Sequence, residues 1–74
     1  METNNNNKSV CVFITNLYTK EEWIHTFTYE DDENLKIKIK EYISAENNIA
    51  IDVIKLTLNK KENKYSAFFS YYLR

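Results

Sequence analysis

The chain has 74 residues, a length that allows one small domain with a single core. A hydrophobic content of 43% and a charged content of 28% are ordinary for a folded protein and exclude wholesale disorder. The net charge of −1 removes the simplest electrostatic argument for a nucleic-acid or membrane partner, and equally for an acidic mimic of DNA. A single cysteine forms no internal disulfide, which favours a reducing, cytoplasmic setting.

The sequence contains no glycine and no proline. Gly-rich phosphate loops and nucleophile elbows are therefore excluded, because each needs a residue without a Cβ at a fixed place. Tight turns must be formed by Asn, Asp or Ser. Asn, Lys, Ile, Tyr and Phe, which have A/T-rich codons, make up half of the chain. This bias indicates an AT-rich genome, such as that of a low-GC bacterium, its phages and plasmids, or a virus.

The polar, low-complexity residues 1–8 predict a disordered tail, and residues 9–74 predict a single α+β domain. The apolar run over residues 10–14 is too short for a signal peptide or a membrane span, so we expect no membrane contact.

Residues 9–16 are apolar on both alternating faces, which predicts a strand in the interior of its sheet. A turn with Asn16 as its left-handed residue follows. Residues 22–30 alternate again, with aromatic side chains and the single histidine on one side. The two segments together predict an antiparallel hairpin.

Residues 31–45 fit both a strand and a helix, since their aliphatic side chains match either period. Acidic residues precede the lysines, as a helix dipole favours, and Asp31 or Asp32 is suited to be the N-cap. We therefore predict a helix that residues 46–48 end, with Asn in the place of Gly. This helix leaves Ile37 exposed to solvent.

Residues 51–59 and 65–73 predict two further strands, joined by a five-residue loop over residues 60–64. The order is strand, strand, helix, strand, strand. We expect a four-stranded, mostly antiparallel sheet with one helix on one face, with a β-grasp-like mixed sheet as the alternative.

The residues with chemically reactive or metal-binding side chains form no catalytic set. His25 and Cys11 are the only soft metal ligands, and two ligands form neither a structural nor a catalytic zinc site. We expect Cys11 to be an inert core thiol and His25 to be structural. We interpret the acidic run at residues 30–33 as a helix-capping feature. We interpret Lys36, Lys38 and Lys40 as part of a helix face that is exposed to solvent. We therefore predict no enzyme, no metal and no cofactor.

The chain has eleven aromatic residues, which are 15% of its length. Because one helix cannot cover both faces of a four-stranded sheet, we expect some of these aromatic side chains to lie on an uncovered surface of the sheet. The simplest reading is that tyrosines border the core with their hydroxyls in water. A second is that the uncovered face binds a protein, either a target or a second copy. A third is a stacking platform for single-stranded nucleic acid, against which the charge balance argues. The side chains form two opposite sets, and the sequence leaves open which of them is exposed. One set is Trp23, Phe27, Tyr29, Tyr65, Phe69 and Tyr71, and the other is Cys11, Phe13, Ile24, Phe68 and Tyr72.

The segment Val12-Phe13-Ile14-Thr15-Asn16-Leu17, followed by Trp23 on a second strand and then an acidic-to-basic helix, resembles the start of the ArdA antirestriction family. The resemblance covers residues 10–58. It implies a mobile-element protein that blocks a host defence by binding to it. The family's turn carries glycines, which this chain lacks, and its strong acidity is not found here, so mimicry of DNA is not implied.

The sequence therefore predicts a small phage- or plasmid-encoded inhibitor of a bacterial defence nuclease, acting in the host cytoplasm. We expect it to occupy a surface of a restriction or CRISPR nuclease without chemistry of its own. The alternatives are a homodimeric structural or regulatory domain and a single-strand nucleic-acid binder. The residues predicted to bind the partner are Glu30, Asp31, Asp32, Glu33, Ile37, Phe68, Tyr71 and Tyr72.

Overall fold

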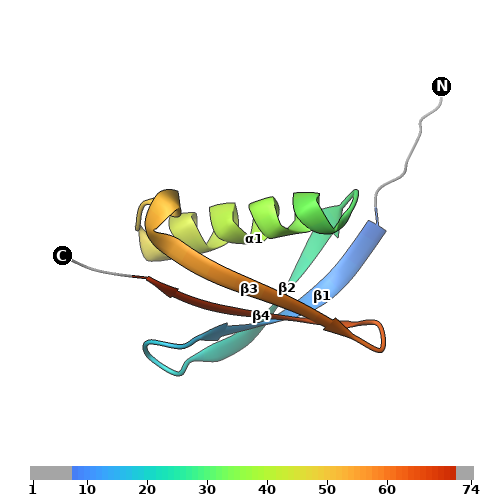
Figure 1. Cartoon of the computed structure of the whole chain (residues 1–74), viewed down its shortest axis with the longest axis horizontal. Helices are drawn as coiled ribbons and strands as arrows, with labels where there is room; N and C mark the ends of the chain where they lie inside the picture. Colours follow the sequence, from blue (N-terminus) through green and yellow to red (C-terminus); the bar gives the residue numbers. More distant parts are fainter. Residues whose placement is uncertain (1–7, 72–74) are drawn as a thin grey trace.

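A computed structural model describes residues 8–71, in which four strands and one long helix form an α+β arrangement (Figure 1). The predicted ββαββ order is confirmed. The rest of the predicted tail lies outside the described residues, while Lys8 already begins the first strand. The strands are β1 (Lys8–Asn16), β2 (Glu22–Tyr29), β3 (Ile54–Lys61) and β4 (Lys64–Tyr71).

The strands form one sheet in the order β2-β1-β4-β3. Both hairpins, β1–β2 and β3–β4, are antiparallel, whereas β1 runs parallel to β4, with Val12 beside Tyr65 and Asn16 beside Phe69. The sheet is thus mostly antiparallel, as predicted, and its one parallel central pair makes it a mixed sheet. β1 is thus an interior strand, as predicted, but only one of its two apolar faces is covered by the helix.

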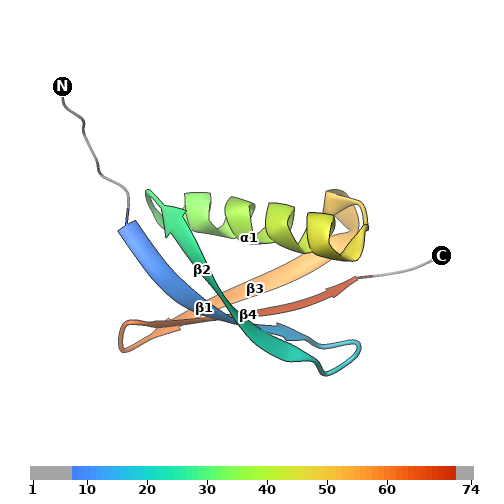
Figure 2. The ribbon, with the colours of Figure 1, turned by 180° about the vertical axis from the view of Figure 1, so that it is seen from behind.

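Helix α1 (Asp32–Asn47) lies across one face of the sheet (Figure 1, Figure 2). It begins at a predicted cap, because the Asp31 carboxylate accepts a 2.8 Å hydrogen bond from the backbone N–H of Asn34. The Asn34 side chain in turn accepts a 3.0 Å bond from the backbone N–H of Glu30. The helix ends at Asn48, whose left-handed backbone (φ 55°) takes the place of glycine. Among residues 8–71, no helix has the length and apolar character of a membrane span.

The core lies between α1 and the sheet face that it covers. Burying each of its larger aliphatic or aromatic side chains contributes about 1.5–3 kcal/mol. The aliphatic stripe of α1 that the helical period predicts is fully buried. Buried core residues include Val12, Ile14, Phe27, Tyr29, Leu35, Ile39, Ile43, Ile54, Tyr65, Ala67 and Phe69.

The turn between β1 and β2 differs from the prediction, because Asn16 is not its left-handed residue. Asn16 is a buried member of β1, and Lys20 has the positive φ of 70°. The Asn16 Oδ1 accepts hydrogen bonds from the backbone N–H groups of Tyr18 (2.8 Å) and Thr19 (3.2 Å). Its own backbone N–H donates to the Glu21 carbonyl at 2.8 Å. Asn16 therefore organises the turn through its side chain.

The β3–β4 connection and the start of β3 also differ from the prediction. The β3–β4 connection is shorter than five residues, since Lys61 still pairs with Lys64. Glu62 and Asn63, both with positive φ, form a two-residue turn of the type that matches the twist of a hairpin. The first three residues of the predicted third strand form instead a short 3₁₀ helix, η1 (Ile51–Val53), which redirects the chain from α1 into β3.

Candidate protein-binding surface

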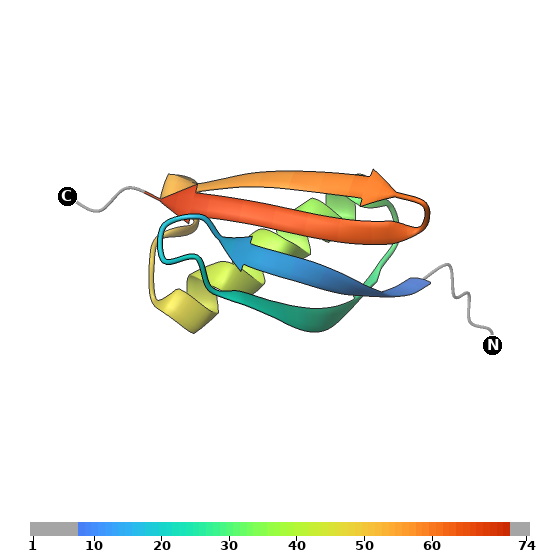
Figure 3. The same ribbon diagram turned by 90° about the horizontal axis from the view of Figure 1, so that it is seen from below.

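The sheet face turned away from α1 is uncovered within the described part of the chain, and we call it the open face (Figure 3). The burial pattern of β1 shows the difference between the two faces, because Val12 and Ile14 are fully buried while Phe13 between them is exposed. The apolar residues of the open face among residues 8–71 are Cys11, Phe13, Ile24 and Phe68.

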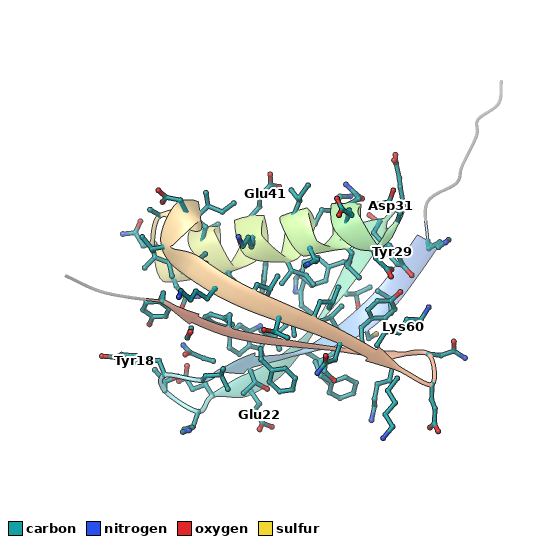
Figure 4. All side chains as sticks on the ribbon, in the orientation of Figure 1. Tyr18, Glu22, Tyr29, Asp31, Glu41 and Lys60 are labelled. Carbon is teal, nitrogen blue, oxygen red and sulfur yellow. The ribbon has the colours of Figure 1, made fainter. Side chains whose placement is uncertain are left out.

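Phe13 and Ile24 are the most prominent apolar pair of the open face. They lie directly opposite each other in the β1–β2 ladder, and they are 39% and 55% exposed. Together with Thr15 and Glu22 they border a shallow hollow of about 390 Å³. Figure 4 shows Glu22 pointing away from α1, on this same side. We call this the open-side hollow, lined by Phe13, Ile14, Thr15, Glu22, Trp23 and Ile24.

A second hollow lies on the other side of β2, where the end of α1 packs over the start of the strand. Trp23 donates a 2.9 Å hydrogen bond from its indole N–H to the Tyr42 hydroxyl. The His25 ring stacks on the Tyr42 ring at 4.1 Å between centroids. These contacts fix the two aromatic walls of a hollow of about 290 Å³. We call it the helix-side hollow, lined by Glu21, Trp23, Tyr42, Glu46 and Asn47.

Both hollows include Trp23, so they adjoin at the beginning of β2. Their charged residues are all acidic: Glu22 on the open side, and Glu21 and Glu46 on the helix side. Among residues 8–71 the lysines of the open face belong to β3 and β4, and the Lys64 ammonium of β4 reaches to 4.9 Å from the centre of the Phe13 ring. The β2 side of the molecule thus combines exposed apolar surface with negative charge, a combination that suits an apolar and basic partner.

The predicted acidic run lies away from this surface, at the start of α1. Asp31 is occupied as the helix cap, and Asp32 accepts a 2.9 Å hydrogen bond from the Tyr65 hydroxyl. Asp31, Asp32 and Glu33 line the same hollow as Lys8 and Lys60, which offset their negative charge. The side chains of Asp31 and Asp32 are therefore engaged in the fold.

The other predicted contact residues are spread over three places. Ile37 is 53% exposed on α1 and lies beside Leu56 in a groove toward β3. Phe68 is half-buried on the open face. Tyr71 faces the helix side, where it packs against the core and lies 5.6 Å from the Tyr18 ring, so it is not the exposed aromatic edge that the sequence predicts. Tyr72 lies outside the described residues.

Cys11 is not the core thiol that the sequence predicts. It is exposed on the open face, with its sulfur 3.4 Å from the Thr26 hydroxyl. His25 points to the other face of the sheet, where it contacts Tyr42 and Phe27. No group of three potential metal ligands comes together among residues 8–71.

No protein-family model, no curated protein and no solved structure matches the chain. The sequence pattern groups Phe13 and Ile24 on one face but leaves open which face is uncovered, and it does not indicate Tyr42 and Glu46 as neighbours of Trp23. Nothing in the local pattern signals this contact, because it depends on how α1 crosses the sheet.

Proposed function

We propose that the protein is a non-enzymatic binding protein that acts by occupying a surface of another protein. The observation that carries this proposal is the Phe13–Ile24 pair, an exposed apolar contact on the open face of the sheet. Leaving such side chains in water forgoes about 25 cal/mol of stabilisation per Å² of apolar area, and a partner recovers it on binding. Trp23, which lines both hollows, adds an aromatic side chain of the kind that is common at binding interfaces.

We further propose that the target is a bacterial defence nuclease, of the restriction or CRISPR type. The resemblance of residues 12–17 and Trp23 to the start of the ArdA antirestriction family supports this target class. The acidic side chains around the two hollows give physical support, since nucleases bind nucleic acid through basic surfaces. Occupation of such a surface would keep the nucleic acid out without any chemistry.

Co-purification from host cells that express candidate defence systems tests the proposed function. The tagged chain is expected to retain a nuclease subunit at a fixed ratio, and Ile24→Lys is expected to lose it, because a charge is introduced into the apolar contact. Ile37→Lys is the matched control, since Ile37 is 53% exposed against 55% for Ile24 and lies on the helix. If the tagged chain is recovered without any nuclease subunit from every host that expresses a defence system, the proposal is contradicted.

One observation supports a second candidate function, the binding of single-stranded nucleic acid. Phe13 and Phe68 lie on the two central strands of the open face, and the Lys64 ammonium is 4.9 Å from the centre of the Phe13 ring. Lys61 lies opposite Lys64 in the β3–β4 ladder. Aromatic rings beside lysines are typical of sheet surfaces that stack bases. This function requires a salt-dependent mobility shift of an oligonucleotide that Lys64→Gln weakens.

A further inference from the structure

The outer edge of β2 is unpaired within the described residues, since β2 is the first strand in the sheet order. Two hydrogen bonds show which backbone groups face outward. The carbonyl of Glu21 accepts from Asn16 of β1, so it points into the sheet. The carbonyl of Thr28 accepts a 2.8 Å bond from the Lys38 ammonium on α1, so it points out of the sheet. Because directions alternate along a strand, Ile24 and Thr26 also direct their N–H and C=O groups outward.

The two ends of this edge differ. At the Thr28 end, the Lys38 side chain covers the outward carbonyl, and a lysine in such a place discourages pairing with another chain. From Glu22 to Thr26 no side-chain hydrogen bond to an outward backbone group occurs among residues 8–71. The start of β2 is therefore the part of the edge on which a further strand has room to pair.

The open-side and helix-side hollows flank this same stretch of β2, one on each face of the sheet. A strand that pairs with β2 directs successive side chains alternately to the two faces. One set would enter the open-side hollow beside Phe13 and Ile24, which is apolar. The other set would enter the helix-side hollow, where Trp23 and Tyr42 form aromatic walls and Glu46 supplies negative charge. The chemistry of the two hollows thus specifies an alternating pattern.

We propose that the start of β2 captures an extended segment of the target protein in which basic and apolar side chains alternate. The segment adds a strand to the sheet, with main-chain hydrogen bonds to Ile24 and Thr26. Its apolar side chains pack against Ile24 at the border of the open-side hollow. Its lysine or arginine side chains lie against Trp23 and Tyr42, with Glu21 and Glu46 as counter-charges. This inference rests on the proposed function, since it assigns the mode by which a protein target is bound.

A second copy of this chain fits the edge less well. The other edge strand, β3, is basic, with Lys60 and Lys61 near its end, which complements the acidic β2 side. Its apolar residues Leu56 and Leu58, however, pack against the core of their own chain. A second copy would therefore bring charge but no apolar side chains to the open-side hollow, and charge complementarity alone is a weak source of affinity.

Titration with synthetic peptides tests this inference on the purified full chain. The probe is a capped six-residue peptide of alternating arginine and leucine, and the emission of Trp23, the single tryptophan, is the readout. Two further peptides carry three N-methyl groups each, on the arginines or on the leucines. In an extended peptide these two sets of N–H groups point to opposite edges. We expect the unmodified peptide and one N-methylated peptide to bind, and the other to lose binding by at least tenfold.

Protein variants locate the site. Glu46→Gln is expected to weaken peptide binding about two- to fivefold, since it removes one charge contact. Glu41→Gln is the matched control, because Figure 4 shows Glu41 on the same helix pointing away from the sheet. Thr26→Pro removes an outward N–H, a change that edge strands tolerate, and is expected to abolish binding while circular dichroism remains unchanged.

Several outcomes would overturn the inference. The inference fails if the unmodified peptide does not bind or if the two N-methylated peptides bind equally well. It also fails if Glu46→Gln and Glu41→Gln have equal effects on peptide binding. Concentration-dependent dimerisation that Thr26→Pro abolishes would assign the edge to a second copy instead. If a target protein co-purifies equally well with Thr26→Pro and the unmodified chain, the proposed function stands and this docking mode fails.

Discussion

Tyr65 of β4 donates a 2.9 Å hydrogen bond from its hydroxyl to the carboxylate of Asp32, the first residue of α1. The Tyr29 hydroxyl lies 3.5 Å from the same oxygen of Tyr65. Tyr65 is 4% exposed, so this short chain of polar groups joins the helix to the two halves of the sheet at the border of the core. The hydrogen bond with Tyr29, burial and the negative Asp32 carboxylate raise the pKa of the Tyr65 hydroxyl above its usual range.

The raised pKa of Tyr65 predicts a pH dependence of stability. The folded state holds the phenolic proton more tightly than the unfolded state, whose pKa is about 10. The contribution of Tyr65 is therefore fully present below pH ~10 and is lost as the pH rises further. Tyr65→Phe is expected to lower the free energy of unfolding by about 1 kcal/mol at pH 7. Urea titrations of both proteins check this, and a difference that stays constant up to pH ~11.5 would refute it.

The cap of α1 is a second point at which stability is testable. Asp31→Ala removes the acceptor for the Asn34 backbone N–H and is expected to reduce the free energy of unfolding by about 1 kcal/mol. Glu33→Ala is the control, because it removes an acidic residue from the same helical turn without removing the cap. Equal losses in thermal unfolding of the two variants would mean that charge, and not the cap, stabilises the helix.

The buried Asn16 predicts a larger effect. Asn16→Ala leaves the backbone N–H groups of Tyr18 and Thr19 without their acceptor, and the expected cost is about 2 kcal/mol. Asn59→Ala, at an exposed position of β3, is expected to change stability by less than about 0.5 kcal/mol. Chemical denaturation of both variants measures the two values. A neutral Asn16→Ala would show that the turn does not depend on this side chain.

The exposed thiol of Cys11 predicts reactivity in the native protein. A disulfide reagent such as 5,5′-dithiobis(2-nitrobenzoate) is expected to modify one thiol per chain without denaturant, because Cys11 lies on the open face. Cys11→Ser is expected to leave stability within about 0.5 kcal/mol. Reaction only after addition of denaturant would place the thiol in the core and would contradict the arrangement of β1.

Local patterns in the sequence predict most of the elements of this fold. The acidic start and Asn-rich end of α1 are capping signals that act within a few residues, and both are confirmed at Asp31 and Asn48. The apolar character of both faces of β1 predicts its interior position, which is also confirmed. The hairpin connection at residues 60–64 is predicted, but its two-residue turn at Glu62 and Asn63 is not, because neither residue is the glycine that normally marks such a turn.

The candidate surface is less predictable because it depends on contacts between distant segments. The pairing of β1 with β4 joins Val12 to Tyr65, and no local pattern encodes it. The exposure of Cys11 and the inward position of Tyr71 both follow from which face α1 covers. The sequence offers two apolar faces on these strands, and only the crossing of the helix decides between them.

The proposed function depends on binding through the Phe13–Ile24 side of the sheet. Phage plating on a host that carries the defence system identified by co-purification tests this dependence. We predict that the unmodified chain and Ile37→Lys restore plaque formation to the level of an undefended host, and that folded Ile24→Lys does not. Equal protection by Ile24→Lys, or loss of protection in Ile37→Lys alone, would contradict the account and move the contact to the helix.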